Sequence, residues 1–334
     1  MSSRLVVLFI PFVVIAIFWA MAKWEAKGIH DPTRKGYFER NGVVLGIVFI
    51  ALVVLWTLFL VVLPYLYMVV ESFHPTLRPN ERGGPLDVLT TAQYESFFVA
   101  HSGEGMNKVH IGAFVFSILA SIAVTALNFA ICYPLAFYMA QSGTPQKVRL
   151  IFLGLIVPYW VNEILRAFSL RLLLASKGLI NQMLMGIGIT DAPIDFLGNN
   201  VGLYVGLSYA YLLVMMFPLY NAVESLDKNQ IEAARDLGAP WWRIHKDVVI
   251  PYAKPGIASG CTMVFMLSAG SLAAPQFLGG PKTLWFTSIV YDFFFQAFNW
   301  PRGAAYAFLL LAACIALVMV MLRLFKVSLG ETIK

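Results

Sequence analysis

Charged residues are scarce in this sequence. Only 13% of its 334 residues are Asp, Glu, Lys or Arg, whereas 59% are hydrophobic, and the mean hydropathy is +0.74. Soluble domains average about 25% charged and about 45–50% apolar residues. The imbalance excludes a soluble globular protein. It indicates an all-α polytopic membrane protein, because long apolar segments in lipid satisfy their backbone hydrogen bonds internally as helices.

Cysteine and histidine are too few and too scattered to build a site. The three cysteines, Cys132, Cys261 and Cys314, all fall in apolar runs, and the five histidines show no metal-ligand spacing. We therefore interpret the cysteines as small buried hydrophobic residues, and we expect no disulfide and no metal site. No serine or metal-ligand pattern converges with acids, so we expect no catalytic residues and no enzyme.

A nucleotide-binding motif is also missing. The nearest text is residues 279–283, Gly-Gly-Pro-Lys-Thr, where a proline interrupts the Gly-Lys-Thr order that a phosphate loop requires. No cofactor is expected on this chain, so ATP and Mg would belong to a separate subunit. The net charge of +6 does not indicate nucleic acid, since Lys and Arg gather on the cytoplasmic side of membrane proteins.

Seven apolar runs are candidate membrane spans. They cover residues 5–22, 42–70, 110–140, 150–165, 201–223, 255–274 and 304–324. The first could be a signal peptide, since Arg4 precedes it and residues 20–22 resemble a cleavage site. We interpret it as an uncleaved helix, because the loop after it is basic. A short interfacial helix is expected near Tyr94, Phe97 and Phe98, and an irregular outer segment from the fourth span to Asn200.

The basic residues give the orientation. Of the 24 Lys and Arg residues, 15 fall in four segments that this topology places inside: 23–41, 141–149, 225–255 and 323–334. The positive-inside rule therefore predicts an N-terminus outside and a C-terminus in the cytoplasm. It also places the polar stretch that precedes the sixth span in the cytoplasm.

That stretch, residues 230–256, is the most polar run in the C-terminal half. Asp227 followed by Gln230 is a capping-box pattern, which predicts a helix from Lys228 that stops at Gly238. A second short helix is expected from Pro240, with Pro251 ending it. Trp241, Ile244, Val248 and Val249 would share one apolar face of that helix. Because short helices are marginal alone in water, this face needs a partner.

The same residues resemble a family signature. Glu232-Ala233-Ala234, then Gly238, then Val248 and Ile250-Pro251 look like the "EAA" motif of the permease subunits of binding-protein-dependent ABC importers. The resemblance implies that residues 227–256, called the EAA loop from here on, form a coupling helix that sits in a cleft of a cytoplasmic ATPase subunit. The residues that it assigns to ATPase coupling are Glu232, Ala233, Ala234, Asp236, Gly238, Trp241, Arg243 and Pro251.

Further motifs between Val157 and Ala305 look like the spermidine/putrescine-type subfamily. The resemblance implies the transmembrane domain of a type I ABC importer over residues 42–328, with an extra N-terminal helix and basic loop in 1–41 and a tail in 329–334. It implies a bacterial inner-membrane location and four kinds of partner. These are two ATPase subunits, a second permease that the subfamily favours as non-identical, an external solute-binding protein and membrane lipid, with no nucleic acid.

Ionisable groups in or beside membrane spans are costly and usually functional, so they are candidates for a substrate path. The candidates are Tyr159, Trp160, Glu163, Arg166, Gln276 and Asp292. Glu163 and Arg166 are three residues apart and could form a structural ion pair instead. Many polyamine-type relatives have an acidic residue where this chain has Gln276, so related amines and amino-acid-derived solutes stay open as cargo. An ATP-independent carrier or channel for small amines is the alternative function.

Overall fold

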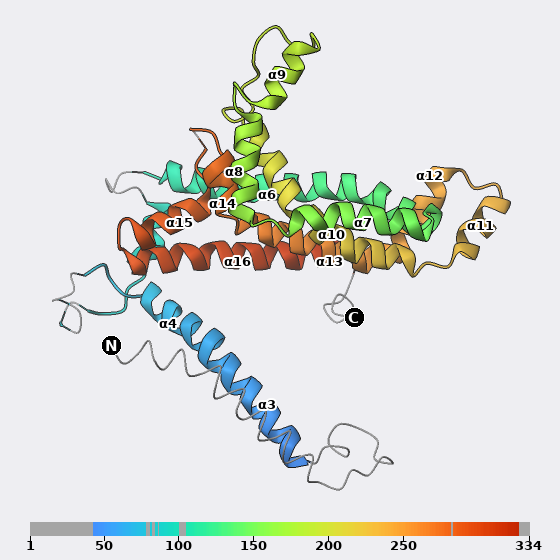
Figure 1. Cartoon of the computed structure of the whole chain (residues 1–334). Coiled ribbons are helices and arrows are strands. Elements are labelled where there is room, and N and C mark those ends of the chain that lie inside the picture. The colour runs from blue at the N-terminus through green and yellow to red at the C-terminus, as the bar shows by residue number, and fades with distance from the viewer. Residues whose placement is uncertain are drawn as a thin grey trace. The chain divides into compact units, whose positions relative to one another are not determined.

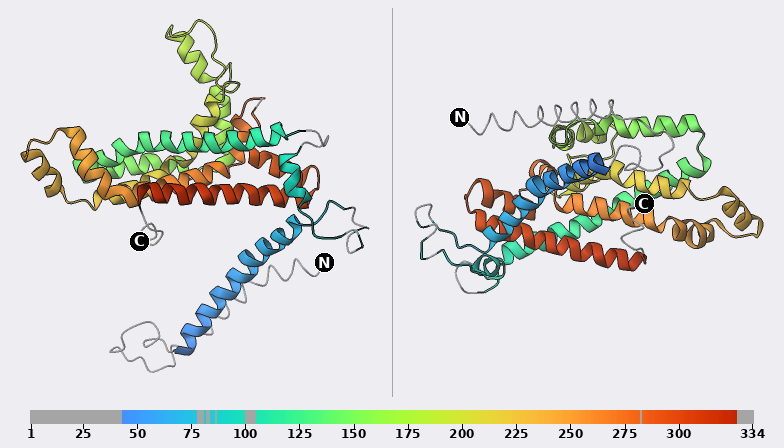
Figure 2. Two further views of the ribbon diagram at one scale, coloured as in Figure 1. Left: turned by 180° about the vertical axis from the view of Figure 1, so that it is seen from behind. Right: turned by 90° about the horizontal axis from the view of Figure 1, so that it is seen from below.

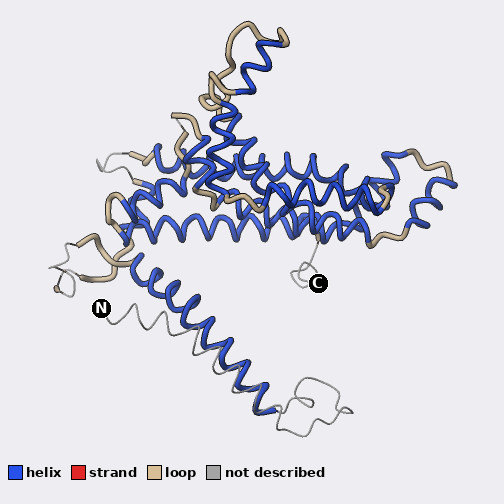
Figure 3. The backbone as a smooth tube through the Cα atoms, viewed as in Figure 1, coloured by secondary structure: helices blue, strands red, loops and turns tan. Residues whose placement is uncertain are grey.

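The computed structural model describes residues 43–77, 81, 84–85, 87–99, 105–281 and 283–326. The predicted first span, the basic loop after it, Lys282 and the tail 329–334 lie outside the described residues. The chain divides into two compact units, residues 1–70 and 71–334. Throughout the described residues the regular structure is helical (Figure 3).

In the first unit, α3 (Val43–Thr57), the π-helical turn η1 (Leu58–Val62) and α4 (Leu63–Ser72) form one apolar helix. Residues 46–72 are long and apolar enough to cross a membrane. Most of the large apolar side chains along this helix are exposed, as lipid-facing side chains are. The second predicted span is confirmed.

Long helices lie side by side in the second unit (Figures 1 and 2). They are α6 (Lys108–Phe137, extended to Ser142 by η2), α7 (Pro145–Tyr159), α10 (Val201–Glu224), α13 (Ile250–Ala269) and α16 (Trp300–Phe325). α10 packs against both α6 and α13, and α16 packs against α13. Together with residues 46–72 of the first helix, α6, α10, α13 and α16 give five helices in the described residues that are able to span a membrane. The number is six if α7 and the bent segment after it count as one span.

Small residues let α10 and α13 approach closely. A Cβ added to Gly256 would lie 2.3 Å from the Cβ of Ala222 and 2.5 Å from the carbonyl oxygen of Pro218. At Gly260 an added Cβ would lie 2.8 Å from the sulfur of Met215. Membrane helices associate by such close packing, because lipid offers no hydrophobic driving force between them.

The fourth span is bent, which corrects the prediction of a single helix over 150–165. α7 ends at Tyr159, and the segment Glu163–Gly186, which begins with α8 (Glu163–Leu174), leaves at an angle of 94°. The Asn162 side chain accepts a hydrogen bond of 2.9 Å from the backbone N–H of Ile164, and so starts a new helix. The outer segment is also less irregular than expected, since it holds α8 and α9 (Leu179–Gly186).

Shorter helices complete the end of the unit opposite α11 (Lys228–Asp236) and α12 (Trp241–Ile244) (Figure 1). They are α5 (Ala92–Phe98), α14 (Ala273–Leu278) and α15 (Phe286–Phe295). The helix expected around Tyr94 is present as α5. Phe97 is buried there, within 5.9 Å of Phe286 and 5.6 Å of Tyr306 between ring centroids, whereas Phe98 is exposed.

Candidate functional site

The EAA loop begins and turns where its sequence predicts. Its first helix, α11 (Lys228–Asp236), starts with the Asp227 carboxylate accepting a hydrogen bond of 3.0 Å from the N–H of Asn229. Gly238 has φ +75°, and its N–H donates to the Arg235 carbonyl while the Ala239 N–H donates to the Ala234 carbonyl. These two bonds are a Schellman motif, which closes the helix end on a left-handed residue.

The second half of the loop differs from the prediction. α12 (Trp241–Ile244) runs through a π-helical turn, η3 (His245–Val249), directly into α13, so Pro251 does not end a helix. In η3 the N–H of Ile250 donates to the carbonyl of His245, five residues back. This widened turn lets a proline follow at the start of α13, where its missing N–H and its ring are tolerated.

The π turn also changes which side chains face inward. Ile244 and Val249 are buried, as expected, but Trp241 is 70% exposed and does not join them. His245, which the sequence reasoning treated as an isolated histidine, takes the inner position and is only 6% exposed. No local signal identifies it, because the residues of α6 that it contacts lie more than 100 residues earlier in the chain.

The outer surface of the EAA loop is apolar at its turn and charged around it. Leu237 is 88% exposed, and Trp241 and Trp242 are also exposed. The Arg243 guanidinium lies 5.4 Å from the ring centroid of Trp242. The other predicted coupling residues are exposed too, apart from the half-buried Ala234: Glu232, Ala233, Asp236, Gly238 and Pro251. The loop forms one end of the helix bundle (Figure 1).

A second group of predicted residues lies at the break between α7 and α8. Glu163 Oε1 accepts a hydrogen bond of 3.3 Å from the Tyr211 hydroxyl of α10. The Arg166 guanidinium lies 5.0 Å from the ring centroid of Tyr159 and 5.7 Å from that of Tyr209. Within the described chain, Glu163 and Arg166 do not form an ion pair. The guanidinium lies against aromatic rings, and the Glu163 carboxylate has no cationic partner among the residues that the structure describes.

Gln276 lies on a helix that packs against α8 and so belongs to this group, whereas Asp292 lies on a helix that packs elsewhere. α14, which carries the exposed Gln276, packs against α8, with Arg171 Nη1 donating to the Phe277 carbonyl at 3.3 Å. Asp292 lies on α15, which packs on α16 and α6, and its carboxylate accepts from Gln296 Nε2 at 2.7 Å. Trp160, at the break itself, is largely exposed.

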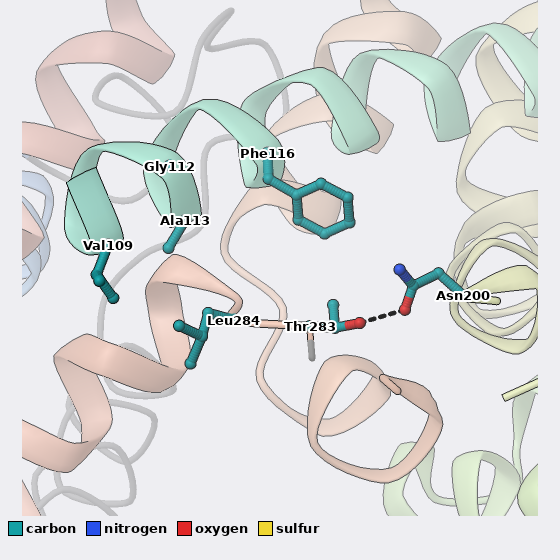
Figure 4. Close-up of a pocket in the computed structure, with 7 residues that line it drawn as sticks. All are labelled: Val109, Gly112, Ala113, Phe116, Asn200, Thr283 and Leu284. Carbon is teal, nitrogen blue, oxygen red and sulfur yellow. Dashed lines mark hydrogen bonds between the residues drawn. The ribbon is translucent and has the colours of Figure 1, made fainter. Parts of the chain in front are cut away.

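A cavity of about 290 Å³ lies elsewhere, between the first turns of α6 and the segments that precede α10 and α15. In Figure 4 the hydrogen-bonded side chains of Asn200 and Thr283 form one wall, opposite the apolar residues of α6. Its described lining residues are Val109, Gly112, Ala113, Phe116, Asn200, Thr283 and Leu284. None of them is charged, and none is a predicted path residue.

Solved structures with the same fold define the class. The chain superposes on a bacterial alginate ABC transporter in complex with alginate pentasaccharide-bound periplasmic protein with a TM-score of 0.65, over 87% of this chain and 98% of that one, at 15% identity. A second structure of a bacterial ABC transporter for alginate import gives a TM-score of 0.61 at 14% identity. The fold is that of a transmembrane domain of a type I ABC importer, as predicted.

Sequence comparison identifies the family. Residues 134–329 match the binding-protein-dependent transport system inner membrane component family. The chain is 32% identical to the spermidine/putrescine transport system permease protein PotB of Haemophilus influenzae, over 77% of this chain and 85% of that protein. It is also 32% identical to PotB of Escherichia coli, over 77% and 89%. The chain belongs to this family: it is a permease subunit of an ABC importer and an inner membrane component, not an enzyme.

Proposed function

We propose that this permease carries a polyamine or a related amine that an external solute-binding protein delivers. It would work with a second, non-identical permease and with two cytoplasmic ATPase subunits that hold ATP and Mg. The similarity to two spermidine/putrescine permeases over more than three quarters of the chain supports the cargo class. The basic residues of the inner segments support an orientation with the EAA loop and the C-terminus in the cytoplasm and the N-terminus outside.

The exposed tip of the EAA loop supports the proposed coupling of this chain to an ATPase subunit. Leu237, Trp241 and Trp242 present apolar and aromatic surface that the described part of the chain leaves exposed. Aromatic residues in such a position are typical anchors of protein interfaces. Glu232, Asp236 and Arg243 would form the polar rim, and Gly238 would allow the tight turn between the two helices.

The cargo path is proposed to pass the helix break at Glu163. Broken membrane helices expose backbone carbonyls and polar side chains, and they often form transport sites. Since Arg166 occupies the faces of the Tyr159 and Tyr209 rings, the Glu163 carboxylate is the group available to an ammonium cargo. Gln276 on the neighbouring α14 would contribute a neutral contact. Asp292 lies on a different helix, α15, and would act only as a separate contact.

Co-purification with uptake tests the proposal. The full chain would be expressed with its neighbouring reading frames, and uptake of labelled putrescine and spermidine would be measured in cells. We expect an ATPase subunit to co-purify with the chain, and Trp241→Ala to reduce both its retention and uptake at least tenfold, as for an interface anchor. Arg323→Ala, on the last turn of α16, is the matched control. ATP-independent uptake by the chain alone would overturn the proposal in favour of a carrier.

A further inference from the structure

His245 is a polar side chain buried on the inner side of the EAA loop. It is only 6% exposed, and its Nε2 atom has no hydrogen-bond partner among the described residues. Its Nδ1 atom lies 2.6 Å from the hydroxyl oxygen of Tyr133 on α6, a short hydrogen bond. Because a buried polar group that loses its partner is costly, this one bond is the contact that fixes the imidazole against α6.

Three aromatic rings surround the imidazole. The centroid of Trp241 lies 4.1 Å from that of His245, the centroid of Phe137 lies 4.4 Å away, and that of Tyr133 lies 5.7 Å away. Trp241 and His245 are one helical turn apart on the loop, and Tyr133 and Phe137 are one turn apart on α6. Two pairs of rings from distant parts of the sequence therefore pack against each other.

This packing connects the exposed surface of the loop to the interior of the bundle. Trp241 is largely exposed, so a partner on the loop would contact it directly. His245 lies behind Trp241 and contacts α6, which also packs on α10 and α13. In the part of the chain that the structure describes, the Tyr133–His245 bond is the hydrogen bond that joins side chains of the EAA loop and α6. Close-packed rings deform little, so a displacement of Trp241 would reach α6 with little loss.

We propose that Tyr133 and His245 are positioning residues that transmit movement of the EAA loop to α6. The inference rests on the proposed docking of an ATPase subunit on the loop. Docking gives the loop its movement, and the ring contact makes α6 follow it. Without the contact, the loop would still bind and stimulate the ATPase, but the bundle would respond less.

The test is the number of solute molecules transported for each ATP hydrolysed. It uses the complete importer in proteoliposomes, with labelled spermidine and the purified binding protein. Tyr133→Phe keeps the ring and removes only the hydroxyl, so the protein should fold. We expect this ratio to fall about two- to tenfold, which corresponds to the net contribution of one hydrogen bond, with the ATPase rate maintained. His245→Leu should have a similar effect, and the double variant should be no worse than either alone.

Two further variants separate this role from a structural one. His245→Asn can place an amide nitrogen near the position of Nδ1 and should recover part of the ratio. Tyr252→Phe removes a hydroxyl that donates to the Ser225 carbonyl at 2.9 Å at an exposed position of the same loop, and it should leave the ratio unchanged.

Three results would overturn the inference. They are an unchanged ratio in Tyr133→Phe, an equal loss in Tyr252→Phe, and a loss that follows reduced retention of the ATPase subunit instead of reduced transport per ATP. Failure of the proposed function is seen separately, in the wild-type chain, as the absence of any co-purifying ATPase subunit.

Discussion

Gly238 holds the EAA loop in a backbone conformation that most residues avoid. Its φ of +75° lies in the left-handed region, while a Cβ at this position would meet nothing within 4 Å. Substitution is therefore opposed by the backbone, not by crowding. Residues with branched Cβ atoms are the least able to adopt this conformation, and asparagine is among the most able.

Replacing Gly238 by valine should reduce uptake at least tenfold, because the turn between α11 and α12 would lose its geometry. Gly238→Asn is the matched control and should retain most of the activity. Uptake in cells, normalised to the amount of permease in the membrane, is the measurement. Equal activity of the two variants would show that the left-handed turn is not required.

In the proposed path, Glu163 and Gln276 would decide how well the path suits a cation. Glu163→Gln removes the carboxylate that lacks a cationic partner, and we expect the rate of spermidine uptake to fall about tenfold or more, the effect of losing a charge-assisted contact. Gln276→Glu introduces an acid on the adjoining helix and should raise the rate. Asp292 lies on α15 and Glu163 on α8, so Asp292→Asn should have less effect than Glu163→Gln. The opposite order would move the path towards α15.

At the scale of the helices, α10 and α13 pack closely at Gly256. An alanine at Gly256 would press on the backbone of Pro218 as well as on Ala222, so the helices must separate to admit it. Alanine normally favours a helix over glycine by about 1 kcal/mol, so a loss of stability here would report packing alone.

Gly256→Ala should therefore destabilise the purified protein by about 1–3 kcal/mol, the usual effect of overpacking. Gly154→Ala is the control, because a Cβ at this position on α7 meets nothing within 4 Å, and it should be neutral or stabilising. Thermal unfolding in detergent, followed by tryptophan fluorescence, compares the two. Equal shifts in Tm would argue against close packing at Gly256.

The sequence predicted these helices unevenly, for physical reasons. Hydropathy located the spans over 110–140, 201–223 and 304–324, because each is one uninterrupted apolar run. Local rules also gave the start and turn of the EAA loop, where Asp227 and Gly238 act through neighbouring backbone groups. They failed at Pro251, where a π turn admits the proline, and at Asn162, whose cap divides the fourth span. The contact of Tyr133 with His245 depends on tertiary packing and has no local signal.

For the whole molecule, the two ends of the bundle are proposed to face opposite sides of the membrane. The three native cysteines are free and buried, so they should react slowly with a maleimide that does not cross the membrane. In the proposed orientation Leu237 is exposed on the cytoplasmic side. Leu237→Cys should therefore be labelled only after the membrane is opened. Gln296→Cys, next to α15 at the other end, should be labelled in intact spheroplasts. Reversal of this pattern would contradict the assigned orientation.

The uninterrupted helix from Trp241 to Ala269 has a mechanical consequence. It contains 29 residues, and at a rise of 1.5 Å per residue it is a rod about 40 Å long. Tilting such a rod by about 5° about one end would swing its other end by about 3–4 Å. In the proposed orientation, a small rotation at the EAA loop would become a larger displacement at the opposite end of α13, with no helix needing to unwind.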